Sequence, residues 1–596
     1  MILAQQSLHK IKLPFVCLTL IVALSFSLSA QSQEDESKSG AAETGMLRGR
    51  VIDETGQPIP HATVYVNGSV ALSQPRITFT DDGGNFQIYG LDALIYNVGA
   101  SAPSYVTAPR EPDSSPSYFR IGDSVTISML KGGVVTGTVT TATGEPMVQM
   151  GVRAILIRDA NGQPPAALRF PPAKSTDDRG VYRIYGLTPG IYLVSAGGGG
   201  PYGYSINGYD TETPTYAPSA TRDGAAEITV RAGEETSGVD IRYRDEPGHA
   251  VSGVVNGPTA PDSSSSINIS LTQIINGVPQ SSFFSYQLLA SKGFAFYGVA
   301  DGDYDLIAQS FLNQGEIVSS EPRRITVKGR DVTGIELVLK GLASISGQLT
   351  LEASTAAECN NRRHPLLSET LLIARRSEKN PSKDRAFSNL FAQSSPDKSG
   401  KFQLRNLAPG QFNLDVRFFA KYWYVSSIAR EPTAAQPVIG RVGVNNRQTD
   451  AARSWISLKF GERVSGLTVT LAEGAASLRG AIKTAAGESI PPKLYLYLAP
   501  AEKENAEDVL RFFITPIPAE GMFGINNLPP GRYWVLARVA ADNEPQSISK
   551  LRAPEETNMR TQIRRAAETA KTAVEFKPCE NVSTFELPFK NALLKK

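Results

Sequence analysis

Apolar and polar residues alternate over short runs along most of this chain. In the stretch 176–194 (TDDRGVYRIYGLTPGIYLV), Tyr182 and Ile184 flank one polar residue, and Gly180 precedes them. Alternation of this kind predicts a half-buried β-strand, and a glycine before the strand favours a tight turn. The Pro-Gly pair that ends at Gly190 indicates a second turn. The stretch therefore predicts a hairpin followed by a return strand.

The same pattern recurs along the chain. Its copies lie at 80–91, 176–194, 291–306, 398–414 and 519–535. A short strand pattern that begins with glycine precedes each copy, at Gly49, Gly137, Gly253, Gly347 and Gly480. Closing patterns follow the later copies, and Cys579 in the last one stands where two others have Gly233 and Gly461. A repeat of roughly 110 residues is far longer than a solenoid unit, so each copy is expected to be a domain.

Short strands separated by glycine, proline, asparagine and aspartate predict an all-β fold. We expect tandem antiparallel β-sandwich domains, either transthyretin-like or Ig-like. The segment 554–572 begins with proline and two glutamates and contains no glycine, so it predicts one short C-terminal helix. The expected parts are a signal peptide at 1–30, a disordered polar leader at 31–45 and β-sandwiches at 46–130, 131–245, 246–340, 341–472 and 473–590.

Two of the copies resemble a known domain family. The residues that match are GRVIDETGQPIPHATVYV at 49–66, TDDGGNFQIYGL at 80–91 and TDDRGVYRIYGLTPGIY at 176–192. This pattern resembles the carboxypeptidase regulatory-like domain, a transthyretin-like (prealbumin-like) β-sandwich with a carbohydrate-binding-like fold. The resemblance implies the fold. The chain as a whole looks similar to bacterial exported proteins that carry tandem copies of this domain. Members accompany peptidases, transporters and surface proteins, so it implies little about function.

The N-terminus has the pattern of a secretory signal. Lys10 and Lys12 precede an apolar run over 13–28, and small residues follow up to Ala30. A basic region, an apolar region and a small-residue cleavage site predict a signal peptide cut near Ala30. The run is short for a spanning helix, although an uncleaved anchor is the alternative. We therefore expect an exported protein, in the periplasm or at the cell surface, with no membrane span in the mature chain.

Charge and histidine content narrow the functional classes. The chain has 60 Lys and Arg against 58 Asp and Glu, without a long run of one sign, so no nucleic-acid partner is expected. His61, His249 and His364 are not followed by the residues that a zinc carboxypeptidase requires. The activity in the family's name is therefore not transferred. We expect no catalytic residues, no cofactor and no metal.

Two aspartate pairs raise the question of calcium. They are Asp81-Asp82 and Asp177-Asp178, each directly before a predicted hairpin turn. Neighbouring side chains on a strand end point apart, and no third acidic ligand has the spacing of a calcium loop. Capping of the turn by aspartate is the favoured interpretation.

A loop rich in glycine and proline at 197–218 carries four tyrosines. They are Tyr202, Tyr204, Tyr209 and Tyr216. Exposed aromatic side chains on loops can bind sugars or peptides, since each ring offers an apolar face and a polar tip. In the alternative, the tyrosines fold back and cover the edge of a sheet.

The mature chain is expected to retain two cysteines, Cys359 and Cys579. In an oxidising compartment such a pair suggests one disulfide between the insertion of the fourth domain and the end of the fifth. Two free thiols remain the alternative.

Together these patterns predict a non-catalytic multidomain protein for binding, display or spacing at the cell envelope. Its partner would be an envelope protein or a glycan. The alternative is a carbohydrate-binding protein that uses sandwich faces and the tyrosine loop, and an enzyme is the least favoured hypothesis.

Overall fold

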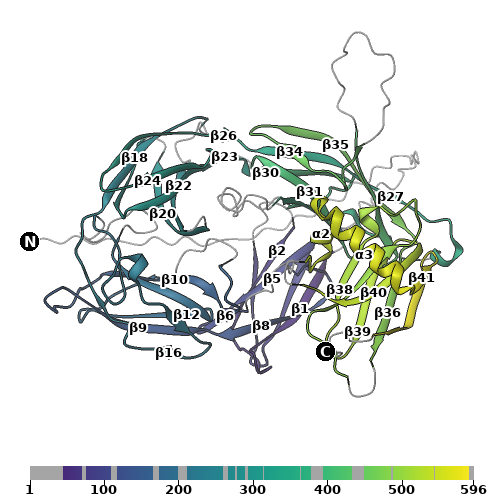
Figure 1. Ribbon diagram of the computed structural model, residues 1–596, viewed down its shortest axis with the longest axis horizontal. Helices are drawn as coiled ribbons and strands as arrows, with labels where there is room; N and C mark the ends of the chain where they lie inside the picture. The colour runs from purple at the N-terminus through teal and green to yellow at the C-terminus, as the bar shows by residue number, and fades with distance from the viewer. Residues whose placement is uncertain are drawn as a thin grey trace, which may run out of the picture. The chain divides into compact units, whose positions relative to one another are not determined.

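The described part of the chain consists mainly of β-strands, arranged as five pairs of sheets in the computed structural model (Figure 1). The structure describes residues 44–69, 75–108, 117–165, 173–198, 211–258, 266–275, 278–288, 293–312, 315–360, 362, 364–377, 393–431, 449–484, 488–541 and 544–589. The expected signal peptide and nearly all of the expected leader lie outside these ranges. We number the pairs sandwich 1 to sandwich 5 along the chain.

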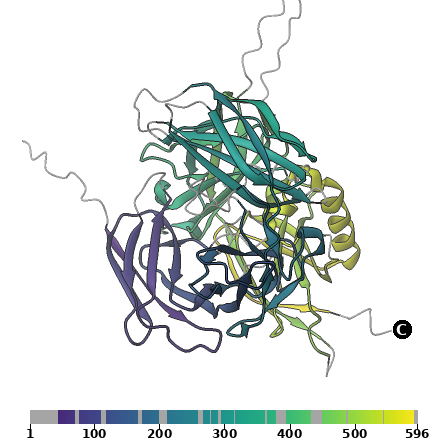
Figure 2. The same ribbon diagram turned by 90° about the vertical axis from the view of Figure 1, so that its left-hand side faces the viewer.

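Sandwich 1 is formed by β1 to β8, drawn in purple tones in Figure 2. One sheet has the order β4-β1-β8-β6 and the other β3-β2-β5-β7. The strands are Gly45–Ile52 (β1), Thr63–Gly68 (β2), Arg76–Phe79 (β3), Asn85–Leu91 (β4), Ile95–Ser101 (β5), Tyr105–Thr107 (β6), Phe119–Arg120 (β7) and Ser124–Lys131 (β8). Leu47, Val64 and Phe86 are among the buried side chains between the sheets.

Sandwich 2 is formed by β9 to β17. One sheet has the order β12-β9-β16, with β17 also on β9, and the other β11-β10-β13-β14, with β15 also on β13. The elements are Gly133–Thr140 (β9), Gly151–Asp159 (β10), Ala173–Ser175 (β11), Val181–Leu187 (β12), Gly190–Ala196 (β13), Thr215–Tyr216 (β14), the 3-10 helix Arg222–Gly224 (η1), Ile228–Val230 (β15), Glu235–Thr236 (β16) and Ile241–Arg242 (β17).

Sandwich 3 is formed by β18 to β26. Its sheets have the orders β21-β18-β25 and β20-β19-β22-β23-β26, with β24 also on β22. The strands are His249–Asn256 (β18), Ser266–Ile275 (β19), Val278–Leu288 (β20), Gly293–Val299 (β21), Gly302–Phe311 (β22), Ile317–Ser319 (β23), Arg323–Val327 (β24), Val332–Val338 (β25) and Lys340–Gly341 (β26).

Sandwich 4 is formed by β27 to β35. Its sheets have the orders β30-β27-β35-β32-β33 and β29-β28-β31-β34. The elements are Ala343–Glu352 (β27), Ala357–Cys359 (η3), Leu367–Glu369 (η4), Thr370–Arg376 (β28), Gln393–Ser394 (β29), Lys401–Leu407 (β30), Gly410–Phe418 (β31), Trp423–Arg430 (β32), Thr449–Asp450 (β33), Ile456–Leu458 (β34) and Arg463–Glu473 (β35).

Sandwich 5 is formed by β36 to β42 and two helices. Its sheets have the orders β39-β36-β42 and β38-β37-β40-β41. The elements are Ala476–Lys483 (β36), Leu494–Pro500 (β37), Val509–Arg511 (η5), Phe513–Pro516 (β38), Met522–Leu528 (β39), Gly531–Val539 (β40), Ile548–Leu551 (α2), Pro554–Glu556 (η6), Thr557–Ala570 (α3), Ala573–Phe576 (β41) and Asn581–Pro588 (β42).

The glycine-led strand lies inside the first sheet of every sandwich. In sandwich 4, β27 pairs antiparallel with the hairpin strand β30 and parallel with the closing strand β35. In the same way β1 lies between β4 and β8, β9 between β12 and β16, β18 between β21 and β25, and β36 between β39 and β42. The predicted all-β fold of tandem sandwiches is therefore confirmed. The first sheet of each sandwich is mixed, because the closing strand crosses over from the second sheet and pairs parallel with the glycine-led strand.

The glycine that begins each of these strand patterns lies directly against the closing strand. A Cβ built on Gly137 would stand 2.1 Å from the carbonyl oxygen of Val239. A Cβ on Gly480 would stand 2.2 Å from the carbonyl oxygen of Phe585 and 2.7 Å from the ring of Phe523. Contacts this short exclude any side chain, so glycine lets a carbonyl group and an aromatic ring approach the backbone closely.

A tyrosine hydroxyl closes the turn after the hairpin strand. Tyr533 donates to the carbonyl oxygen of Pro529, four residues earlier, at 3.0 Å. The equivalent bonds join Tyr96 to Asp92, Tyr192 to Thr188 and Tyr304 to Ala300. A buried hydroxyl needs a hydrogen-bond partner, and the turn carbonyl provides one. Sandwich 4 has Phe412 at this position and so lacks the hydroxyl.

The predicted C-terminal helix is confirmed. The segment begins with η6, whose first residue is Pro554, and continues as α3, Thr557–Ala570. Ile563 of α3 packs with Tyr497 and Ile514 on the outer side of sandwich 5. No helix in the described ranges is long and apolar enough to cross a membrane.

The glycine contact makes a testable prediction within sandwich 2. Gly137→Ala is expected to lower the free energy of unfolding of this sandwich by about 2–3 kcal/mol, because its Cβ would overlap the Val239 carbonyl. Gly151→Ala in β10 is the matched control, since nothing lies within 4 Å of its Cβ position. Hydrogen exchange of the β9 and β12 amides measures the local stability, and equal protection in both variants would contradict the steric argument.

The tyrosine turn predicts a pH dependence. Burial, with Asp92 nearby, raises the pKa of Tyr96 to about 12, above the value of about 10 in an unfolded chain. The folded state then keeps a proton that the unfolded state loses, so stability is constant below pH 10 and falls above it by about 1.4 kcal/mol per pH unit. Tyr96→Phe is expected to cost about 1 kcal/mol at pH 8 through the lost hydrogen bond.

The variant should also lack the alkaline decline, so its stability should equal or exceed that of the wild type by pH 11. Denaturant unfolding followed by hydrogen exchange of β5 from pH 8 to pH 11 provides the measurement. Tyr89→Phe, at an exposed position, is the control. A parallel pH profile for Tyr96→Phe and wild type would contradict the prediction.

Candidate functional site

The expected ligand loop does not present Tyr216 to solvent. Tyr202, Tyr204 and Tyr209 lie outside the described residues. Tyr216 forms part of β14, is 5% exposed and packs against Ile155 and Leu193. The prediction of an exposed ring is therefore wrong for Tyr216, because burial of its apolar surface favours the position over the sheet. This residue follows the alternative in which tyrosines cover a sheet edge.

The histidines lie in different sandwiches with different partners. His61 is 3.6 Å from a carboxylate oxygen of Asp82, on the surface of sandwich 1. In sandwich 3, His249 lies 3.3 Å from Asp301. His364 stacks at a tilt near Trp423, with ring centroids 5.6 Å apart. Within the described ranges, no group of three or more His, Cys, Asp or Glu side chains is placed to hold a metal.

The aspartates before the hairpins cap turns, as predicted. Asp81 Oδ1 accepts the backbone N–H of Asn85 at 2.7 Å. Asp177 Oδ1 accepts the N–H of Val181 at 2.8 Å, and the Arg179 guanidinium donates to its second oxygen at 2.9 Å. Hydrogen bonds from Arg179 and Val181 lower the pKa of Asp177. These carboxylates therefore satisfy turn amides.

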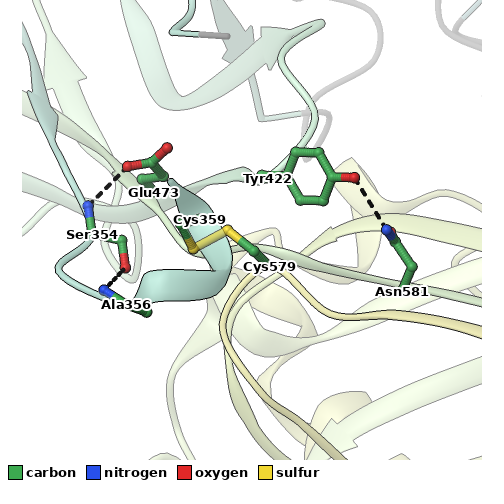
Figure 3. The surroundings of a disulfide bond; sticks show 7 residues. All are labelled: Ser354, Ala356, Cys359, Tyr422, Glu473, Cys579 and Asn581. Atoms are coloured by element: carbon green, nitrogen blue, oxygen red, sulfur yellow. Dashed lines mark hydrogen bonds between the residues drawn. A yellow bond between two sulfur atoms is a disulfide. The ribbon is translucent and has the colours of Figure 1, made fainter. Parts of the chain in front are cut away.

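A disulfide joins sandwich 4 to sandwich 5. The Sγ atoms of Cys359 and Cys579 are 2.04 Å apart, and 220 residues separate the two positions in the sequence (Figure 3). Cys359 ends η3, in the insertion after β27, and Cys579 precedes β42. Both side chains are buried. The bond therefore connects the insertion of sandwich 4 to the last strand connection of sandwich 5.

Cys579 occupies a turn position that glycine holds elsewhere. Its φ is 57°, close to the 68° of Gly233 and the 69° of Gly461. The N–H of Cys579 donates to the carbonyl of Gly474 at 2.9 Å, in the connection between sandwiches 4 and 5. Gly461 bonds in the same way to Gly341 at 2.7 Å. In sandwiches 4 and 5 this turn is therefore bonded to the connection that precedes the sandwich, and in sandwich 5 cysteine adds a covalent bond.

Tyr422 forms hydrogen bonds with the connection between sandwiches 4 and 5, beside the disulfide. Its carbonyl oxygen accepts the N–H groups of Gly474 and Ala475 at 2.7 and 2.8 Å. Its hydroxyl accepts a hydrogen bond from Asn581 at 3.1 Å, as Figure 3 shows. The Arg362 guanidinium lies 4.5 Å from the Tyr422 ring centroid, a cation–π contact. Tyr422 of sandwich 4 thus contacts the connection through its backbone carbonyl and sandwich 5 through its side chain.

Asn527 provides a second link between these sandwiches. It has φ 59°, in the left-handed region that asparagine tolerates better than most residues. Its Nδ2 donates to the carbonyl oxygens of Ala420 at 2.8 Å and Trp423 at 2.7 Å, both in sandwich 4. The hairpin strand of sandwich 5 is thereby bonded to its neighbour.

Asn406 repeats this arrangement one sandwich earlier. Its φ is 59°, its Nδ2 donates to the carbonyl of Gly315 at 2.9 Å and its Oδ1 accepts the N–H of Ile317 at 2.9 Å. The equivalent positions in sandwiches 1 to 3 are Gly90, Gly186 and Gly298, also with positive φ. Glycine only allows the left-handed turn, whereas asparagine allows the turn and also hydrogen-bonds to the preceding sandwich.

A partly buried aspartate also contacts both sandwiches. Asp415 on β31 accepts hydrogen bonds from Arg375 at 3.0 Å and from the Ser549 hydroxyl of α2 at 2.9 Å. Burial opposes ionisation of Asp415, but Arg375, Arg417 and Ser549 outweigh it and lower its pKa. An ionised carboxylate, whose Oδ2 accepts hydrogen bonds from both sides, therefore lies between sandwich 4 and α2.

A small cavity lies beside this carboxylate. Its volume is about 30 Å³, and Asn413, Asp415, Ser549 and Arg552 provide its polar lining. Burial lowers the pKa of Arg552 to about 10, and its guanidinium donates to backbone carbonyls of η5 and the residue after it. A volume of about 30 Å³ holds roughly one water molecule, so the cavity is too small for an organic ligand.

The sequence reasoning did not identify these polar links. Asparagine replaces glycine in the pattern before Leu407 and Leu528, where the earlier copies read Tyr-Gly-Leu or Tyr-Gly-Val. Alignment of the copies could have singled out both asparagines. Asp415 has no counterpart signal, because its partners come from distant parts of the sequence.

Comparison with known proteins identifies the first sandwich. Residues 46–116 match the family model of the carboxypeptidase regulatory-like domain, so recognition of this family is confirmed for that segment. A search of curated proteins found no match.

Several solved structures are similar to this chain at low identity. The TIE protein of Bacillus anthracis is 10% identical, over 83% of this chain and 70% of that one, with a TM-score of 0.14. The minor pilin GBS52 of Streptococcus agalactiae is 12% identical, over 37% and 99%, with a TM-score of 0.18. Two B repeats of the Staphylococcus aureus collagen-binding protein are 10% identical, over 72% and 100%, with a TM-score of 0.13. At these values we take no function from them.

The disulfide predicts a stability effect confined to two sandwiches. Replacing Cys359 and Cys579 by serine is expected to leave all the sandwiches folded. It should lower the free energy of unfolding of sandwiches 4 and 5 by up to about 5 kcal/mol, because a closed loop spanning 220 residues no longer restricts the unfolded chain. Differential scanning calorimetry measures the transitions, and reduced wild-type protein is the control. Unchanged transitions, or free thiols in tryptic peptides of native protein, would contradict the prediction.

Proposed function

We propose that this protein is an exported, non-catalytic scaffold that presents β-sandwich surfaces at set positions in the cell envelope, where they bind or space a partner. The supporting observation is the junction of sandwiches 4 and 5. There a disulfide, the Asn527 side chain and the Asp415–Ser549 bond all connect one sandwich to the next. Polar groups that could have formed a reactive site are instead used to fix neighbouring domains.

The strand directions favour spacing within each sandwich. The first and closing strands run parallel, as β36 and β42 do. The chain therefore enters each first sheet at one end and leaves it at the other. Connections are short: Gly132 alone separates β8 from β9, Leu342 separates β26 from β27, and two residues separate β35 from β36. Short connections limit the reach of relative motion.

Export and domain organisation are part of the proposal. A disulfide is typical of secreted and envelope proteins, which agrees with the signal peptide expected at 1–30. We propose folding units at 46–130, 131–245, 246–340, 341–472 and 473–590. The proposed location is the periplasm or the cell surface, and the proposed partner is an envelope protein or a glycan.

Pulsed electron paramagnetic resonance tests the spacing role. Spin labels on an unnatural amino acid at Lys401 in sandwich 4 and Ser583 in sandwich 5 leave the disulfide intact, and both positions are exposed. The wild-type distance distribution is expected to be narrow. It should broaden when Asn527→Gly is combined with serine at both cysteines, because glycine keeps the backbone turn and removes the side-chain bonds.

Labels at Lys401 and Arg405, both within β30, are the control and should be unaffected. A broad wild-type distribution, or one that the triple variant leaves unchanged, would refute fixed spacing. Turnover of peptide or glycoside substrates by purified protein, surviving repurification, would refute the non-catalytic role.

A further inference from the structure

The outer face of the second sheet of sandwich 1 exposes apolar side chains. Ile77 is 55% and Phe79 64% exposed, both on β3. On the neighbouring strand β2, Tyr65 lies opposite Ile77, and the inward-facing Val64 is completely buried. Exposed large apolar residues that adjoin on one sheet face indicate an interaction surface.

Sandwich 5 has the same side-chain pair at the equivalent place. Tyr497 on β37 lies opposite Ile514 on β38, as Tyr65 lies opposite Ile77. The alignment follows from the turn tyrosines: Tyr96 is opposite Gly68 and Tyr533 is opposite Pro500, each three residues after the tyrosine of the pair. The two faces are therefore equivalent residue by residue.

In sandwich 5 this pair is covered by helices. Tyr497 is 1% and Ile514 9% exposed, and Leu551 of α2 and Ile563 of α3 pack on them. Helix α3 contacts both β37 and β40, and Figure 1 shows it beside β40. Its buried face consists of Arg560, Ile563 and Ala567, so the helix is amphipathic. Sandwich 5 thus shows that amphipathic helices can cover a sheet face that carries this Tyr–Ile pair.

The corresponding faces of sandwiches 2 and 3 are also covered. In sandwich 2, Tyr216 packs on Ile155 and Leu193. In sandwich 3, Ile307 packs against Ala408 of sandwich 4. Sandwich 1 instead leaves Ile77 exposed and Tyr65 partly exposed, although Ser69, directly after β2, bonds to Ser395 of sandwich 4.

We propose that the face formed by β3, β2 and β5 of sandwich 1 is a docking site for an amphipathic α-helix of a partner protein, which packs as α3 packs on sandwich 5. The face of a sheet, unlike its edge, is buried by a helix or by a second sheet. Recognition of an amphipathic helix by its apolar face is a common mode of protein binding. This inference extends the proposed binding role by naming the class of partner.

The surface beside Tyr65 has room for a side chain of that helix. Gly99 on β5 lies opposite Tyr65, where sandwich 5 has Leu536 opposite Tyr497. A Cβ on Gly99 would meet only one ring atom of Tyr65, at 4.0 Å. A helix that supplied an apolar side chain here would fill the space that Leu536 fills in sandwich 5.

A peptide of this chain is the probe. The fluorescently labelled peptide of residues 547–572, which contains α2 and α3, is titrated with the full-length mature protein, and binding is followed by anisotropy. We expect saturable binding with a gain of helical circular dichroism, because a helix this short is marginal alone in water. Ile77→Asp is expected to weaken binding at least tenfold, since a carboxylate replaces the exposed apolar contact.

Two further variants locate the site. Gly99→Lys should also weaken binding at least tenfold, because it fills the space beside Tyr65 and changes no exposed apolar residue. Met522→Asp, at another exposed apolar position of similar exposure, is the matched control and should bind like the wild type. Far-ultraviolet circular dichroism and calorimetry establish that each variant is folded.

Three results of the peptide titration would overturn the inference. The first is absence of saturable binding at 1 mM protein, and the second is equal peptide binding by wild type and Ile77→Asp. The third is that the helix-breaking peptide Ile563→Pro binds as tightly as the original peptide. A protein dimer that Ile77→Asp abolishes, seen by sedimentation velocity, would assign the face to a second copy and would also overturn it. The spin-label distances between sandwiches 4 and 5 do not depend on this face, so a failure here is distinct from a failure of the spacing role.

Discussion

Every sandwich depends on one close approach, in which a carbonyl oxygen of the closing strand lies against a glycine of the first strand. At Gly253, Gly347 and Gly480 the paired register shifts beside the contact, so the closing strand bulges toward the glycine. Because this contact seats the closing strand parallel to the first one, entry and exit lie at opposite ends of the sheet. The next sandwich then begins within one or two residues at Gly132, at Leu342 and at the connection after β35. A single steric requirement thus links local backbone geometry to the spacing of domains.

The copies of the repeat differ in residue type at positions where the shared backbone conformation accepts more than one residue. The residue before the last position of the hairpin strand must adopt a left-handed conformation in every copy, and either glycine or asparagine can do so. Where asparagine occurs, at Asn406 and Asn527, its amide reaches carbonyls of the preceding sandwich. Cys579 uses a second left-handed position in the same way, since glycine would suffice for the turn and the thiol adds the disulfide. Junctions therefore become more firmly joined toward the C-terminus by substitution at turn positions.

Much of the fold could be predicted from the sequence because turns and alternation are local properties. Gly180, Gly400 and Gly521 have positive φ at the predicted hairpin turns, and the helix begins within the predicted segment. The parallel closing strand could not be predicted, since register between strands about 100 residues apart depends on tertiary contacts. For the same reason the bond from Asp415 to Ser549 left no local pattern. The loop pattern around Tyr216 was compatible both with exposure and with burial over the sheet edge, and pairing of a two-residue strand decides for burial.

Sandwiches 1 and 5 have the same residues at equivalent positions of one sheet face, but these residues differ in burial. Their burial is therefore not required by the fold, and an exposed copy is free to take part in binding. Tyr65 and Ile77 form the same cross-strand pair as Tyr497 and Ile514, so the sandwich tolerates the isoleucine of this pair both exposed and buried. The pair in sandwich 5 is buried because the chain forms α2 and α3 between β40 and β41 and packs them on this face. Burial of a large apolar side chain is worth about 1.5–3 kcal/mol. Sandwich 1 folds without that contribution on its outer face, and the same free energy is therefore available to a helix supplied by another molecule.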